Sequence, residues 1–204
     1  LAIGHTIQSI NNQNHEILKK YSDIVIPLTF FAMHAVKVPG NETTVELWTD
    51  LWGEIAHGTE SAIRQNLPLI TAKLNIALES ASWTTKAQAA NAVSTVAVKV
   101  GSDMDEESRN GLLKILVNGL QGRTWNGKER LVNALATLAC HSKEALSKDQ
   151  ELMAMIAEAL YKESKKENIE YRRHALKAFA DVLHELEVDR FTQLYDIAQD
   201  ILTK

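Results

Sequence analysis

The sequence contains few of the residues that interrupt regular secondary structure. Nine glycines and three prolines occur in 204 residues, whereas average usage of the two together is about 12%. A β-sandwich, a β-barrel or a doubly wound α/β fold needs turn residues at intervals of about a dozen positions or fewer. This scarcity excludes those classes, and the sequence predicts an all-α protein.

The sequence also lacks a second cysteine, an excess of basic residues and a long apolar run, and each absence makes one class of structure or partner less plausible. The single cysteine, Cys140, cannot form a disulfide within the chain. Lys and Arg number 22 and Asp and Glu number 26, which gives a formal charge of −4 and argues against binding nucleic acid by neutralising phosphates. No apolar run approaches the roughly 18 residues of a membrane span. We therefore expect no nucleic-acid partner and no membrane insertion.

The chain does contain a repeated pattern of apolar residues at helical spacing. Residues 78–97 and 120–139 align at a constant offset of 42 positions, which brings Trp83 onto Trp125 and Lys86 onto Lys128. A period of about 42 residues lies in the range of HEAT and armadillo repeats, each built around an antiparallel pair of helices. The sequence therefore predicts an α-solenoid in which such pairs stack side by side.

We expect residues 1–204 to form one continuous segment of repeats, a fragment of a longer solenoid. The expected helix pairs occupy about 14–57, 58–101, 105–142 and 148–187, with a partial unit at 190–203. We expect about nine helices or more and no strand. Ser82 and Thr124 are expected to cap the second helices of their pairs, and the rings of Trp83 and Trp125 are expected to be largely buried.

No residue pattern points to catalysis, a metal ion or a cofactor. Neighbouring side chains on a helix diverge by about 100°, so Cys140 and His141 cannot both bind one ion. Glu54 and His57 have the spacing of di-iron bundle ligands, but such a site needs a second copy of the motif, which the sequence lacks. Phosphate-binding and nucleophile motifs are also lacking. We therefore expect no enzyme activity, no catalytic, metal or cofactor residues and no obligate small-molecule ligand.

Basic residues recur once per repeat. Lys86, Lys128 and Arg172 would form a ladder along one ridge of the solenoid, and they are candidates for binding an acidic partner. The interpretation that we favour is that they cap the carbonyl ends of neighbouring first helices, because three charges in a net-negative chain produce a weak field. The charge run at 162–167 is interpreted as a solvated helix end.

One stretch resembles a known family. Residues 119–140 read GLQGRTWNGKERLVNALATLAC and resemble the large HEAT-repeat proteasome adapter and scaffold proteins. The residues that carry the resemblance are Gln121, Gly122, Arg123, Thr124, Trp125, Gly127, Lys128 and Glu129.

The resemblance implies a non-enzymatic solenoid that helps tether or stabilise the core and regulatory particles of the 26S proteasome and link them to other partners. It implies proteasome subunits as partners and a role in proteasome assembly. It also implies a location in the cytoplasm and nucleus, with peripheral attachment to endosomes or endoplasmic reticulum through partners. It supplies no catalytic residues.

Two other classes stay open, because fold alone does not fix function. A nuclear transport receptor or a phosphatase scaffold is built from the same repeats. Either would show acidic insert loops or an inner row of Asp, Trp and Asn, which we do not find in this sequence. A helical-repeat DNA glycosylase needs a basic concave face with aromatic wedges, which the charge of −4 disfavours.

Overall fold

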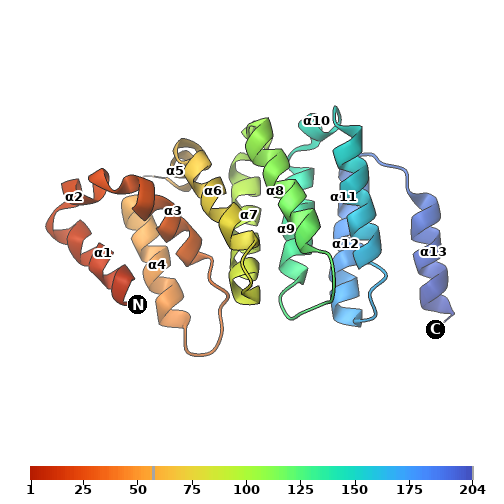
Figure 1. Cartoon of the computed structure of the whole chain (residues 1–204), viewed down its shortest axis with the longest axis horizontal. Coiled ribbons are helices and arrows are strands. Elements are labelled where there is room, and N and C mark those ends of the chain that lie inside the picture. Colours follow the sequence, from red (N-terminus) through yellow and green to blue (C-terminus); the bar gives the residue numbers. More distant parts are fainter. Residues whose placement is uncertain (57, 204) are drawn as a thin grey trace. The chain divides into compact units, whose positions relative to one another are not determined.

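The computed structural model describes residues 1–56 and 58–203, and it is built from helices (Figure 1). The first seven are α1 (Ala2–Gln13), α2 (His15–Lys20), α3 (Ser22–Met33), α4 (Glu42–Ile55), α5 (Thr59–Gln65), α6 (Leu67–Leu78) and α7 (Trp83–Val100). A 3-10 turn, η1 (Gly101–Asp103), precedes α8 (Glu106–Gly119), α9 (Glu129–Cys140), α10 (Lys143–Leu146), α11 (Gln150–Glu163), α12 (Ile169–Glu185) and α13 (Phe191–Leu202). Within the described residues there is no strand, and the predicted all-α class is confirmed.

The chain divides into two compact units, Leu1–Val100 and Gly101–Lys204. In the first unit α3 packs against α4, α6 packs against α7, and α3 also contacts α6. In the second unit α8 packs against α9 and α11 against α12, while α8 contacts α11 and α9 contacts α12. Packed helices joined by short loops run in opposite directions. That the pairs form one continuous array over residues 1–204 remains a prediction.

Small and medium apolar side chains fill the buried faces of α7 and of α9, each within its own unit. Buried residues of α7 include Ala89, Ala92 and Val96, and those of α9 include Leu131 and Leu138. A helix that is apolar over most of its surface has to be covered on several sides. Within the second unit α9 is covered by α8 and α12, which explains why most of its residues are buried.

The first unit is held together at the carboxyl end of α3. Gln88 Nε2 on α7 donates a hydrogen bond to the carbonyl of Phe31 at 2.7 Å, and Asn91 Nδ2 donates to the carbonyl of His34 at 3.3 Å. Thr95 Oγ1, also on α7, lies 2.8 Å from His34 Nε2. The last carbonyls of a helix have no partners within it. Side chains of α7 therefore supply partners for the end of α3.

His34 fits this place as a neutral imidazole. Its Nδ1 lies 2.7 Å from the carbonyl of Phe30, so Nδ1 carries the proton and Nε2 accepts from the hydroxyl of Thr95. Burial lowers the pKa of His34, although the Phe30 carbonyl favours the protonated form. Protonation of Nε2 would remove the acceptor that Thr95 uses.

We expect the free energy of unfolding to fall as the pH falls from histidine's ordinary pKa of about 6.5 through the lowered pKa of His34. In that range the unfolded chain binds a proton that the folded chain resists. Urea unfolding at about pH 7.5 and about pH 5 should show a larger loss for the native chain than for His34→Gln. An equal loss in both proteins would contradict the prediction.

Candidate protein-interaction surface

The residues that carry the family resemblance form the loop between α8 and α9, except Glu129, which is the first residue of α9. Gly122 and Gly127 have φ values of 84° and 108°, a left-handed conformation that is strained for residues with a side chain. The amide of Gly127 donates to Glu129 Oε2 at 3.0 Å, and Lys166 Nζ donates to the carbonyl of Gly122 at 2.9 Å. The loop is thus held at both glycines, by α9 and by the loop that follows α11.

Lys128 is fully buried at the inner side of this loop. Its Nζ donates to the carbonyl of Leu120, the residue that follows α8, and so caps the carboxyl end of that helix. The same Nζ donates to Glu163 Oε2 at 2.9 Å. Glu163 is the last residue of α11 and also accepts a hydrogen bond from the hydroxyl of Tyr171 on α12. These four residues form the Lys128 cluster, which joins the ends of α8 and α11 to the first turn of α12.

The charges of the Lys128 cluster are compensated inside the protein. Burial lowers the pKa of Lys128, and the Glu163 carboxylate opposes this shift. Burial and the hydrogen bond to Glu163 raise the pKa of Tyr171, so its hydroxyl stays protonated. The side chains of Lys128 and Glu163 are 0% and 5% exposed. A partner therefore cannot reach either charge, and the cluster serves the packing of the unit.

The structure changes two predictions made from the sequence, one for the charge run at 162–167 and one for the basic residues of the repeats. The charge run predicts a solvated helix end at 162–167. This prediction is wrong for Glu163, whose side chain is buried. Lys128 contacts the carbonyl end of the first helix of its own pair, α8. Lys86 on α7 and Arg172 on α12 are half-buried and lie in different units. A partner surface formed by Lys86 and Arg172 remains a prediction, and Lys128 cannot contribute to it.

The two tryptophans are more exposed than the repeat pattern predicts. Trp83 is 51% exposed, so the prediction of a largely buried ring is wrong there, and Trp125 is half-buried. Trp83 is the first residue of α7, and Trp125 precedes the first turn of α9. Neither indole therefore lies on the apolar stripe that the helix presents to its neighbours.

The two repeats also differ in how their second helices begin. The amide of Thr85 donates to Ser82 Oγ at 3.3 Å, so Ser82 caps α7 as expected. Thr124 does not cap α9, because the loop continues through Gly127 and the helix begins at Glu129.

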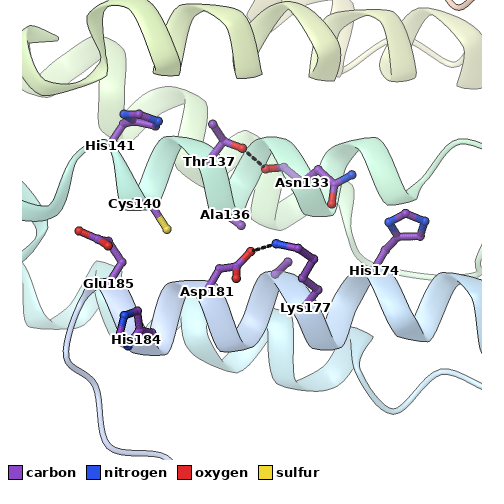
Figure 2. A pocket seen from close by; sticks show the side chains of 11 residues that line it. Asn133, Ala136, Thr137, Cys140, His141, His174, Lys177, Asp181, His184 and Glu185 are labelled. Carbon is purple, nitrogen blue, oxygen red and sulfur yellow. Dashed lines mark hydrogen bonds and ion pairs between the residues drawn. The ribbon is translucent and has the colours of Figure 1, made fainter.

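A groove runs between the facing sides of α9 and α12. One part, of about 570 Å³, is lined by residues that include Asn133, Thr137, Cys140, Lys177, Asp181 and Glu185. Figure 2 shows these side chains in two rows, one from each helix. The other part, of about 480 Å³, is lined by residues that include Trp125, Glu129, Glu170 and Tyr171. His174 lines both parts, which together form the α9–α12 groove.

The groove is acidic. Glu129, Glu170, Asp181 and Glu185 line it, whereas Lys177 is its one lysine or arginine. Lys177 Nζ forms an ion pair with Asp181 Oδ2 (Figure 2). Burial, with the carboxylates of Glu185 and Asp181, raises the pKa of the Cys140 thiol to about 11. The thiol therefore stays protonated at neutral pH and is a poor nucleophile.

The described residues offer neither a metal site nor a membrane-spanning helix. Over residues 1–56 and 58–203, no three His, Cys, Asp or Glu side chains are arranged to hold a metal ion. His57, the second residue of the Glu54–His57 pair, lies outside the described residues. Every helix in the described part of the chain is too short or too polar to cross a bilayer.

Replacing Lys128 with methionine should lower the free energy of unfolding by about 3–5 kcal/mol, because the Glu163 carboxylate would stay buried without its ammonium. The double variant Lys128→Met/Glu163→Leu should recover much of this loss. Lys166→Met, which removes a more exposed lysine from the loop that follows α11, should cost less than about 1 kcal/mol. Urea unfolding followed by circular dichroism measures all three, and equal losses for Lys128→Met and Lys166→Met would refute the role of the cluster.

Trp125→Ala should lower the free energy of unfolding by about 1.5–2.5 kcal/mol, roughly half the loss for a fully buried ring. Trp83→Ala should cost less than about 1 kcal/mol, because half of its side chain already contacts solvent. The same unfolding measurement tests the order of the two losses. A larger loss for Trp83→Ala would show that the exposure of the two rings does not govern their contribution.

Comparison with known proteins finds a family model that matches the C-terminal third of the chain and relatives that align with nearly all of it. Residues 139–204 match the family model described as "ECM29, C-terminal ARM-like repeats". The chain is 43% identical over 203 residues to the proteasome-associated protein ECM29 homolog of Drosophila melanogaster, an alignment that covers 100% of the chain. It is 34% identical over 207 residues to the proteasome adapter and scaffold protein ECM29 of Homo sapiens, with 98% of the chain covered.

A third relative with the same protein name is less similar in sequence. The proteasome component ECM29 of Saccharomyces cerevisiae is 22% identical over 178 residues, or 87% of the chain. The chain spans 10%, 11% and 9% of the lengths of the three relatives. The resemblance first seen in residues 119–140 is therefore confirmed, and the chain is related along its whole length to a segment of the ECM29 proteasome adapter and scaffold proteins.

Proposed function

We propose that this chain is a non-enzymatic, protein-binding segment of a proteasome adapter. In the complete protein it would help tether or stabilise the core and regulatory particles of the 26S proteasome. The observation that carries the proposal is the 43% identity over the whole chain to a protein named as proteasome-associated. Under this proposal the protein acts in the cytoplasm and nucleus, and reaches endosomes or endoplasmic reticulum through its partners.

The architecture of the second unit supports a binding role. Stacked helix pairs present extended surfaces whose affinity comes from many modest contacts. The α9–α12 groove is such a surface, and the Lys128 cluster fixes the loop at one end of it.

Affinity purification of the full-length protein that contains this chain should recover subunits of both proteasome particles. Lys128→Met in the full-length protein should reduce their recovery, because it disorders the second unit, whereas the matched variant Lys166→Met should not. Quantitative mass spectrometry of the eluates measures both effects. The purified protein should hydrolyse neither ATP nor peptides.

A full-length protein that never recovers proteasome subunits would refute the proposal. The transport receptor and phosphatase scaffold classes would then be tested next, by identifying the proteins that do co-purify.

A further inference from the structure

We propose that the α9–α12 groove binds an extended, lysine- or arginine-rich segment of a partner protein, with one cationic side chain seated against Trp125. This inference goes beyond the proposed function, because it names the chemistry of a ligand and holds for any partner that carries such a segment.

The shape of the groove fits an extended chain. The groove follows α12, whose 17 residues span about 25 Å at 1.5 Å per residue. An extended peptide of about seven or eight residues has the same length. A docked helix would need a continuous apolar surface, whereas the groove presents polar groups such as Asn133 and Thr137 (Figure 2). The amide of Asn133 offers both a donor and an acceptor to a peptide backbone.

The charge of the groove selects a basic segment. Four carboxylates line it against one ammonium. That ammonium, Lys177, is paired with Asp181, and the exposed Glu170 is paired with Arg173, its neighbour on α12, at 3.0 Å. Glu170 and Glu185 stand near opposite ends of α12. A peptide cation at one end would share the exposed Glu170 carboxylate with Arg173, and a second cation at the other end would meet Glu185. An acidic peptide or a nucleic acid would meet more negative than positive charge in the groove and would be disfavoured.

Trp125 gives one end of the groove a specific receptor for a cation. Its half-buried indole lines the same hollow as Glu129 and Glu170. An aromatic face beside carboxylates attracts an ammonium or guanidinium group through both the ring quadrupole and the charge. Because Lys128 and the two loop glycines hold the loop in place, the indole is positioned before the ligand arrives, which reduces the entropy lost on binding.

The binding test uses the complete 204-residue chain and a fluorescein-labelled octapeptide of alternating lysine and serine. Fluorescence anisotropy is measured at about pH 8, where histidine is uncharged. We expect the lysine peptide to bind and its affinity to fall when the salt concentration is raised from about 50 to about 300 mM. The same peptide with glutamate in place of lysine should not bind. Absence of lysine-peptide binding, or equal binding of both peptides, would overturn the proposal.

Matched variants then locate the site. Glu170→Gln/Glu185→Gln should weaken lysine-peptide binding about fivefold, as expected for two exposed charge contacts. Glu106→Gln/Glu107→Gln makes the same charge change on exposed residues of α8 outside the groove lining and should leave binding unchanged. Equal effects of the two double variants would mean that the peptide senses only net charge, and would overturn the proposal.

The role of the indole has its own control. Trp125→Ala should weaken lysine-peptide binding further than Trp83→Ala, which removes an exposed indole from the other unit. Trp125→Phe should retain part of the affinity, since it keeps an aromatic face. Circular dichroism checks that each variant is folded. Equal affinities for the Trp125→Ala and Trp83→Ala proteins would exclude Trp125 as the receptor. None of these measurements involves proteasomes, so their failure is distinct from failure of the proposed function.

Discussion

The second unit depends on one buried ammonium. Lys128 Nζ has no solvent to bind, so its charge must be satisfied by groups inside the protein. Two of those groups are hydrogen-bond acceptors: the carbonyl of Leu120, the residue that follows α8, and the carboxylate of Glu163 at the end of α11. The third is the ring of Tyr171 on α12, which faces the ammonium while its hydroxyl donates to Glu163. Satisfying the ammonium therefore fixes the ends of these helices relative to one another, and it orders a polar, glycine-containing loop.

The two repeats that match best in sequence differ at the same point in structure. Residues 83–86 form the first turn of α7, whereas the equivalent residues 125–128 belong to a loop and α9 begins at Glu129. The cause is local, because Gly127, with a φ of 108°, occupies the position of Thr85. Lys128 consequently enters the interior while Lys86 remains half-buried on α7. The first unit is joined instead by His34 and the side chains of α7.

The loop between α8 and α9 carries a buried structural residue, Lys128, and a surface residue, Trp125, only three positions apart. Lys128 points inward and holds the helix ends, while Trp125 lines the outer groove. This arrangement leaves the indole half-buried at the rim of the groove. Four carboxylates from α9 and α12 line the same groove, two of them in ion pairs with Arg173 and Lys177.

The sequence by itself determined the all-α class, the repeat of about 42 residues, the cap at Ser82 and the resemblance to the ECM29 proteins, because helical periodicity, scarce breakers and a short motif are local properties. It could not determine that Lys128 pairs with Glu163, 35 positions away, that a residue of a charged run is buried, or that Trp83 is exposed. It also could not assemble the α9–α12 groove. Burial and charge pairing depend on which helices the fold brings together, and no local pattern records that.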